Sequence, residues 1–340
     1  MTSIINFFYC RLSGIFFCSL VIFFSSNLFA NEKDFANNIK LDKIFFLDGV
    51  VLDDLIILVG EQGILCKSND GGKSWEKIHI ANKKTLTSIA FNKKNIGILV
   101  GHNGTLMRSV DGGNSFNQIK NNFIDSHHTF MRVKWINENS VVAIGSFGLF
   151  IRSDDQGRTW KKKLIINRDF DWHLYDFISL KKEQLLFGEA GTILYKKNNS
   201  KNWVKISSPY KGSFFGAIKQ ENDKILTFGM RGKIFELSFK RRTKNINKKN
   251  IFEWKEIHTN SKATIMSSLN YSPNKVLFFA DSGLVFLLDN INSNVYSIRK
   301  EIKSFAGGIK IKDGTIIGYG LNGYRKVDID SFDNNVKNSN

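Results

Sequence analysis

The sequence predicts an all-β protein, a seven-bladed β-propeller with Asp-box turns that is preceded by a signal peptide. Three observations carry this prediction: an apolar N-terminal segment, a Gly-x-x-Gly pair that recurs roughly every 43 residues, and a polar turn motif present in three copies. The chain has 340 residues with only 2 prolines against 27 glycines, so glycine must make most of the turns. Rigid domains joined by proline-rich spacers are excluded.

Residues 1–30 have the composition of a secretory signal peptide. Arg11 is their only charged residue, the run from Ile15 to Phe24 is almost wholly apolar, and Ala30 supplies a small residue at a plausible cleavage site. Because the apolar run is shorter than the ~20 residues that span a bilayer, we expect cleavage and a periplasmic protein, with an uncleaved membrane anchor as the alternative. Only Cys66 remains after this segment, so no intramolecular disulfide is expected.

Glycine pairs divide the rest of the chain into seven units. The pairs are Gly60/Gly63, Gly101/Gly104, Gly145/Gly148, Gly188/Gly191, Gly229/Gly232 and Gly320/Gly323, and a degenerate copy has Ala280 with Gly283. We expect each pair to form a two-residue hairpin turn, because glycine accepts positive φ without a clash of Cβ.

Short strands surround every pair. In the first unit the apolar run Leu55–Val59 precedes the pair, Ile64–Ser68 follows it, and the aromatic-led strand Trp75–Ile80 closes the unit. A further alternating strand, such as Leu86–Phe91, lies upstream of the next pair. Four short strands in each of seven units predict a propeller rather than a β-sandwich array.

The predicted propeller covers residues 31–330 and is followed by a polar tail at 331–340. The last unit has only three clear strands. We therefore expect Asp34–Leu41 to supply the fourth strand of that blade, which would close the ring by joining both ends of the chain.

The second motif, the Asp box, reads Ser-x-Asp-x-Gly-x-Ser/Thr-aromatic. Its key residues are Ser68, Asp70, Gly72 and Trp75 in the first copy, Ser109, Asp111, Gly113 and Phe116 in the second, and Ser153, Asp155, Gly157 and Trp160 in the third. We expect the aspartates to accept backbone N–H bonds within their own turns, the glycines to be left-handed, and the aromatic residues to pack in the blade. These residues are structural, not catalytic. The fourth copy has decayed to KKNNSKNW at 196–203.

The combined unit resembles the photosystem II stability and assembly factor family of Asp-box propellers. The best-matching stretch is GEQGILCKSNDGGKSW at 60–75, and the resemblance covers 41–325, most strongly in the first three units. It implies an exported, non-catalytic seven-bladed propeller that binds a client membrane protein during assembly through a basic surface. The family has relatives in non-photosynthetic bacteria, and we expect this chain to be one of them.

Sialidases also carry Asp boxes, but their chemistry is not matched. Their first arginine lies in an Arg-Ile-Pro context, whereas neither Pro209 nor Pro273 is beside an arginine. Glu61 and Glu189 share one offset in units one and four, yet three steps around a ring separate them by more than the ~5–9.5 Å that glycosidases use. We expect no catalytic residue, and we keep a periplasmic carbohydrate-active hydrolase or lyase as the alternative function.

Strand order places the Gly-x-x-Gly turns and the crossovers between blades on one face. The residues predicted to bind a ligand there are His102, His127, His128, Trp172, His173 and Arg231; the same face holds Phe147, Asp171 and Lys211. Four histidines on one face allow a transition-metal site or a pH-sensitive patch. Chance placement of histidines in polar loops is the alternative, and no metal-ligand spacing is present. No metal or cofactor is predicted.

The formal net charge of +18 comes mostly from lysines spread over the blades. An insertion at 238–250 holds six basic and no acidic residues, and a basic row of Lys67, Arg108 and Arg152 precedes the Asp-box serines. We expect this row to lie along the blades or to pair locally. The expected partners are a membrane or envelope protein client and an anionic membrane surface. Export makes nucleic acid an improbable partner.

Overall fold

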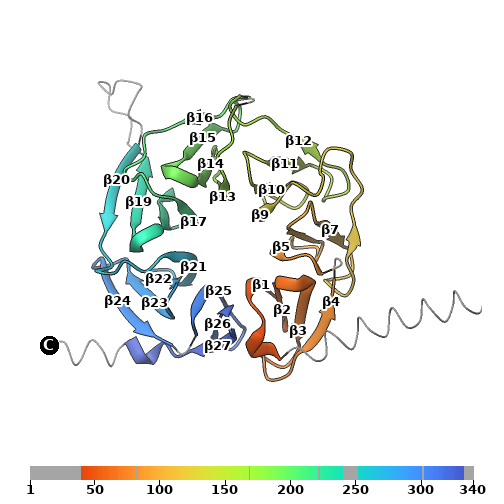
Figure 1. Cartoon of the computed structure of the whole chain (residues 1–340). Coiled ribbons are helices and arrows are strands. Elements are labelled where there is room, and N and C mark those ends of the chain that lie inside the picture. Colours follow the sequence, from red (N-terminus) through yellow and green to blue (C-terminus); the bar gives the residue numbers. More distant parts are fainter. Residues whose placement is uncertain are drawn as a thin grey trace, which may run out of the picture.

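The computed structural model describes residues 40–80, 83–167, 169–220, 223–239, 252–300 and 302–332. The predicted signal peptide and most of the basic insertion lie outside them. Seven antiparallel sheets stand around a central axis, each with its first strand innermost (Figure 1), and this arrangement confirms the seven-bladed propeller.

The strands follow one another from the axis to the rim in each blade. Blade 1 has β1 (Phe46–Leu52), β2 (Leu55–Gly60), β3 (Ile64–Ser68) and β4 (Glu76–His79); blade 2 has β5 (Leu86–Phe91), β6 (Gly97–Gly101), β7 (Leu106–Ser109) and β8 (Asn117–Gln118). Blade 3 has β9 (Phe130–Trp135), β10 (Val141–Gly145), β11 (Phe150–Ser153) and β12 (Lys161–Lys162); blade 4 has β13 (Leu174–Ser179), β14 (Glu183–Gly188), β15 (Ile193–Lys197) and β16 (Val204–Lys205).

The later blades are built in the same way, and blade 7 has three strands in the described residues. Blade 5 has β17 (Phe214–Lys219), β18 (Ile225–Gly229), β19 (Ile234–Phe239) and β20 (Phe252–Ile257); blade 6 has β21 (Ile265–Ser272), β22 (Lys275–Ala280), β23 (Leu284–Asp289) and β24 (Asn294–Arg299); blade 7 has β25 (Ser304–Lys310), β26 (Ile316–Leu321) and β27 (Gly323–Val327). Short 3-10 turns within the described residues include η2 (Leu41–Lys43), η3 (Glu61–Gly63), η5 (Glu189–Gly191) and η7 (Met230–Gly232).

The middle strands are buried over almost their whole length, because both faces of each sheet pack against neighbouring blades. One apolar cluster, for example, joins Ile57 and Val59 of blade 1 to Leu86 and Leu99 of blade 2. Full burial of such a side chain contributes about 1.5–3 kcal/mol. Packing between blades, rather than within them, therefore supplies much of the stability.

The ring is closed by packing between blades 7 and 1. Ile56 and Leu58 share a buried cluster with Ile317 and Tyr319. The segment Asp34–Leu41 was expected to form the fourth strand of blade 7. Its described residues form no strand, since Leu41 begins η2, and residues 34–39 lie outside the described residues. The first described residues instead reach the turn of blade 7, where Gly323 N–H donates to the Ile44 carbonyl at 3.0 Å.

The C-terminal end of the described chain adds to the core. Residues 330–332 are helical, and Phe332 is buried in the cluster that contains Phe279 of blade 6 and Phe305 of blade 7. Packed residues therefore extend to Phe332, and residues 333–340 of the expected polar tail lie outside the described part.

The two glycines of each pair serve different purposes. Gly63 is left-handed at φ 70°, and so is the preceding residue, Gln62, at φ 57°. Gly60, however, is extended at φ −165°, and a Cβ there would overlap with the carbonyl oxygen of Phe45. The expected explanation by positive φ is thus wrong for the first glycine, which is required because the segment entering the blade passes too close for a side chain. The same overlap occurs at Gly101, Gly145, Gly188, Gly229 and Gly320.

Two buried carboxylates near the axis tie several blades together. Asp48 of β1 accepts bonds from the Ser88 hydroxyl (2.7 Å) and Ile89 N–H (3.0 Å) of blade 2 and from the Tyr319 hydroxyl (3.3 Å) of blade 7. Arg132 of blade 3 lies 3.6 Å from the same carboxylate. Burial next to the Asp48 charge raises the pKa of Tyr319 well above its ordinary value, so the phenol remains a donor.

Asp176 of β13 makes the second connection. Its carboxylate lies 2.6 Å from the ammonium of Lys134 in blade 3 and accepts Ala217 N–H of blade 5 at 2.8 Å. Blades 7, 1, 2 and 3 are thus joined at Asp48, and blades 3, 4 and 5 at Asp176. Repeat spacing did not reveal either residue, because the corresponding positions in other blades are not acidic.

Candidate functional site

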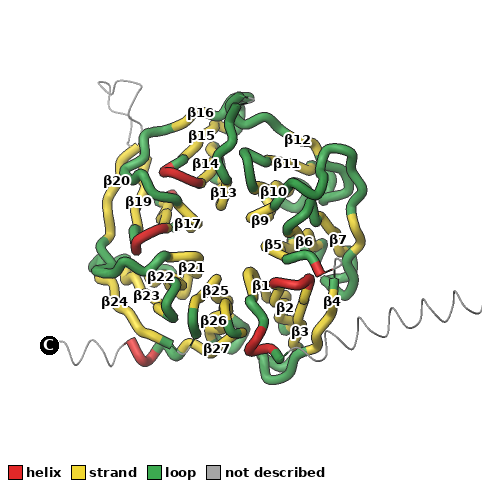
Figure 2. Tube along the Cα trace, viewed as in Figure 1, coloured by secondary structure: helices red, strands yellow, loops and turns green. Residues whose placement is uncertain are grey.

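The backbone of the Gly-x-x-Gly turns is hydrogen-bonded to the crossovers. His102 N–H donates to Thr85 O at 2.9 Å, and Gly104 N–H donates to His128 O at 2.7 Å. Gly148 N–H bonds in the same way to Trp172 O at 3.0 Å. These bonds place the turns and crossovers on one face, called the turn face below. Figure 2 shows η3, η5 and η7 spaced around the ring on this face.

Glu61 and Glu189 have structural roles in this face. Phe45 N–H donates to Glu61 Oε1 at 3.0 Å, and His173 N–H donates to Glu189 Oε2 at 3.2 Å. Each carboxylate therefore holds the segment that enters its own blade. Both carboxylates are thus engaged in turn geometry rather than in an acid–base pair.

Phe147, Trp172 and His173 come together between blades 3 and 4. Phe147 N–H donates to His173 Nδ1 at 3.2 Å, and the two rings meet edge to face with centroids 4.9 Å apart. Because Nδ1 accepts this bond, the neutral ring carries its proton on Nε2. Phe147 is 68% exposed and Trp172 40% exposed, and Phe147 has φ 53°. A bulky aromatic residue held exposed in a left-handed conformation is uncommon in folded proteins.

An aromatic row continues from this group toward the axis. The His173 ring lies 6.4 Å from Tyr175 of β13, which lies 5.0 Å from Phe215 of β17. Burial, with the Glu189 charge as a second cause, raises the pKa of Tyr175. Tyr175 and Phe215 were missed by the sequence analysis. The sequence pattern could have indicated them, because both occupy the second position of an innermost strand, directly after Leu174 and Phe214.

The remaining predicted binding residues do not form one group. Asp125 lies between two histidines, 3.3 Å from His127 Nδ1 and 3.0 Å from His128 Nδ1. His102 is half-buried, which lowers its pKa. Its turn is connected to the histidine pair by the bond from Gly104 N–H to His128 O. Arg231 lies in the turn of blade 5 at φ 57°. Within the described ranges, no cluster of three or more His, Cys, Asp or Glu residues has the arrangement of a metal site.

The Asp-box turns lie at the opposite end of the blades. Asp111 accepts Ser115 N–H at 3.0 Å and the hydroxyls of Ser109 and Ser115 at 2.8 and 2.6 Å. Partial burial opposes ionisation, but these bonds outweigh it and lower the pKa of Asp111 to about 2. Gly113 is left-handed at φ 86°. The copies around Asp70 and Asp155 have the same bonds.

The basic row connects consecutive blades. Lys67 Nζ of blade 1 donates to Asn114 O in the Asp-box turn of blade 2 at 3.2 Å, and Arg108 Nε of blade 2 donates to Gln156 O in that of blade 3 at 2.8 Å. Arg152 of blade 3 instead pairs with Asp154 of its own blade at 2.6 Å. The expectation of local pairing is thus wrong for Lys67 and Arg108, whose partners belong to the following unit.

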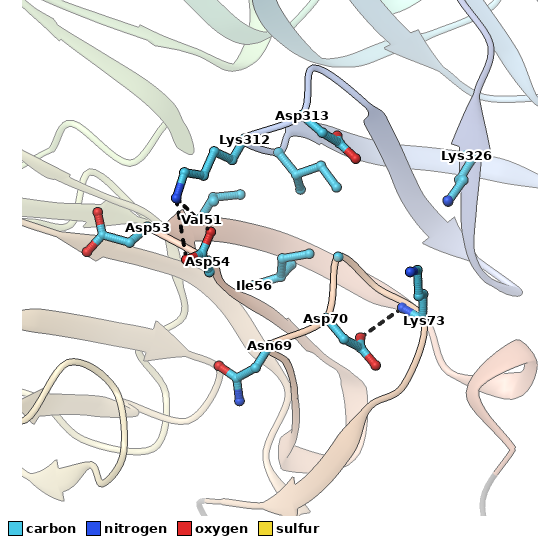
Figure 3. Close-up of a pocket in the computed structure, with 12 residues that line it drawn as sticks. Val51, Asp53, Asp54, Ile56, Asn69, Asp70, Lys73, Lys312, Asp313 and Lys326 are labelled. Atoms are coloured by element: carbon cyan, nitrogen blue, oxygen red, sulfur yellow. Dashed lines mark hydrogen bonds and ion pairs between the residues drawn. The ribbon is translucent and has the colours of Figure 1, made fainter.

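A cavity of about 430 Å³ lies between blades 7 and 1 at the Asp-box end (Figure 3). Its charges are mixed: Lys312 lies 3.1 Å from Asp54, and Asp70 is bound within its own turn, where it accepts Lys73 N–H at 3.0 Å. The cavity therefore presents no strong field of one sign.

The family model for the photosynthesis system II assembly factor YCF48 matches residues 74–314. The chain belongs to this family. No curated protein matches the sequence.

Solved structures similar to this YCF48-family chain are also propellers. YCF48 bound to D1 peptide has 17% identity and a TM-score of 0.66, covering 84% of this chain and 94% of its own. YCF48 from Cyanidioschyzon merolae has 15% identity and a TM-score of 0.63, with 83% and 94% covered. The WD40 β-propeller domain of Doa1 has 13% identity and a TM-score of 0.63, with 83% and 92% covered. At these identities the likeness concerns the fold.

In this member of the YCF48 family, the turn face offers exposed aromatic area on a rigid frame. Hydrogen bonds fix the backbone at Phe147 and Trp172, and the Phe147 ring packs on His173, so little backbone freedom is lost when a partner covers them. No helix in the described part of the chain has the length and apolarity needed to cross a bilayer.

Proposed function

We propose that this propeller binds a segment of a client protein as a non-catalytic assembly or stability factor for an envelope or membrane protein complex. The observation that carries the proposal is membership of the YCF48 family over residues 74–314. A related propeller in complex with D1 peptide supports it, since that protein binds a peptide on the same fold. The composition of residues 1–30, which is that of a secretory signal peptide, supports the proposal that this chain acts in the periplasm.

The client segment docks on the turn face between blades 3 and 4. Large aromatic residues supply much of the energy of protein interfaces, and they do so best where neighbouring groups hold them in place. Phe147 meets both conditions, because its N–H and its ring both contact His173. Trp172 adds a second large aromatic residue, and the bond from Gly148 N–H to its carbonyl fixes the backbone of the crossover. Covering the two side chains removes apolar area that water otherwise contacts.

The function needs no catalytic step. A carbohydrate-active hydrolase would require carboxylates that are available as acid and base. Glu61 and Glu189, the two carboxylates at matching offsets, each accept a backbone N–H instead. No feature of the described residues favours the hydrolase over the binding protein.

The test is affinity capture from detergent-solubilised envelopes, followed by binding of synthetic peptides from the captured protein. We expect one membrane protein to be retained by the wild-type chain, and its peptide to bind with affinity reduced at least tenfold by Phe147→Ala with Trp172→Ala. The matched control is Val110→Ala with Ile291→Ala, since both are exposed apolar residues in turns at the Asp-box end. Equal loss in the control, or glycan hydrolysis without a specific client, would overturn the proposal.

A further inference from the structure

The fourth blade lacks the Asp-box turn with which blades 2 and 3 seal their junctions to the preceding blade. At the junctions of blades 1 and 2 and of blades 2 and 3, Lys67 and Arg108 donate to a carbonyl of the following Asp box. Blade 4 has KKNNSKNW at 196–203 in place of an Asp box. Arg152 therefore makes no such bond and turns to Asp154, and a groove of about 530 Å³ remains between blades 3 and 4.

This groove is strongly basic. Arg152, Lys163, Lys196 and Lys201 line it, and Asp154 is the one carboxylate among its described lining residues. Asp154 already pairs with Arg152, whereas Lys163, Lys196 and Lys201 make no ion pair within the described ranges. Burial, together with repulsion from Arg152 and Lys163, lowers the pKa of Lys196. An anion in the groove would relieve this repulsion.

Apolar side chains accompany the charges. The floor consists of Phe150 and Trp203, whose rings lie 5.9 Å apart, and the Lys196 ammonium lies 5.1 Å from the Trp203 ring centroid. Leu164 lines the groove and is 64% exposed, and Ile166 on the same crossover is also exposed. The strands β12 and β16 are the outermost of their blades and lie at the rim of the ring (Figure 1), next to the lining residues Lys163 and Trp203.

We propose that this groove, the blade 3–4 rim groove, binds the surface of an anionic phospholipid bilayer, with lysines at the phosphates and Leu164 in the headgroup layer. Exposed Lys161, Lys162 and Lys205 on β12 and β16 extend the positive surface. Lysine dominates, and the one arginine of the groove is already paired. Flexible ammonium groups suit a diffuse anionic surface, whereas tight binding of a peptide carboxylate favours an unpaired arginine with its two-pronged geometry.

This inference rests on the export part of the proposed function, because export would bring the chain to a bilayer. It does not require that the chain binds a client protein. Each basic residue near an anionic surface contributes roughly a fivefold gain in partitioning. Replacing Lys163, Lys196 and Lys201 by glutamine should therefore reduce binding about a hundredfold.

The test measures co-sedimentation of the full chain with phosphatidylcholine vesicles that contain about 30% phosphatidylglycerol. Pure phosphatidylcholine vesicles report binding by the apolar N-terminal segment, which does not depend on lipid charge. The control variant replaces Arg299, Lys300 and Lys303 by glutamine. These three line another basic pocket, between blades 6 and 7, so both variants lose the same charge.

Binding that requires the anionic lipid, falls about a hundredfold in the groove variant and persists in the control supports the inference. Equal losses in both variants would mean that only net charge matters and would overturn it, as would equal binding to both kinds of vesicle. Loss of client capture in the groove variant without loss of vesicle binding would assign the groove to an acidic protein and likewise overturn it. Unchanged client capture with lost vesicle binding separates this inference from the proposed function.

Discussion

Removing the Asp48 carboxylate is the most direct test of how the ring is held at its axis. Alanine at this position takes away the acceptor of the Ser88 hydroxyl, Ile89 N–H and the Tyr319 hydroxyl, and the charge 3.6 Å from Arg132. Breaking a buried ion pair by removing one partner costs about 3–5 kcal/mol, and a buried N–H without an acceptor costs about 1–3 kcal/mol. These terms overlap, so we expect Asp48→Ala to lower the free energy of unfolding by about 4 kcal/mol.

The assay is urea unfolding followed by tryptophan fluorescence, with equal m-values as a condition for comparison. Asp48→Asn keeps one oxygen acceptor and should lose about half as much. The control is Asp54→Ala, because Asp54 forms an exposed pair with Lys312 and such pairs contribute about 0–1 kcal/mol. If Asp48→Ala is no more destabilising than Asp54→Ala, the axial network does not hold the ring and the reasoning fails.

Three further outcomes follow from the turns and the buried thiol. Gly145→Ala should lower the free energy of unfolding by about 3 kcal/mol or more, because its Cβ would overlap with the Thr129 carbonyl. Gly314 has a positive φ, 88°, but open space around it, so Gly314→Ala should cost only about 1 kcal/mol in thermal or urea unfolding. Equal costs for the two variants would contradict the explanation by close approach of the backbone. The pKa values of Asp111 and Asp155 are lowered to about 2 from 3.8. Their contribution to stability is therefore complete above pH 4 and is lost as the pH falls toward 2. Over this pH range the melting temperature should fall less in the double variant Asp111→Asn, Asp155→Asn than in the wild-type protein. Burial raises the pKa of Cys66 to about 12, although Lys77 opposes it, so the thiol should react with a disulfide reagent at neutral pH only after unfolding, and rapid labelling of the native protein would be the contrary result.

The sequence predicted the architecture because its signals lie within each repeat. A Gly-x-x-Gly pair needs only its own turn and the segment that enters the same blade, so spacing alone gave seven blades. The Asp box is equally local, since Asp111 bonds to Ser109 and Ser115. The reason for the first glycine was still misjudged, because the carbonyl that excludes its Cβ belongs to a segment about fifteen residues away.

Contacts between repeats were not predictable from a single sequence. The row of Lys67 and Arg108 was visible, but its acceptors lie in the next unit, and nothing in the local pattern points to them. The candidate site shows the same limit. Trp172 and His173 were identified from their crossover, whereas Tyr175 and Phe215 pack across two blades and looked like ordinary strand residues.

The bond between Asp48 and Tyr319 also sets an order for folding. These residues are 271 positions apart, so the chain cannot complete its axial network until its last blade has been synthesised. Closure of so long a loop is slow and entropically costly. Until then the apolar residues Ile56 and Leu58 of blade 1 lack Ile317, their partner in the closed ring. A chain that ends before blade 7 should therefore remain an unclosed propeller with exposed apolar surface, which proteases and chaperones recognise.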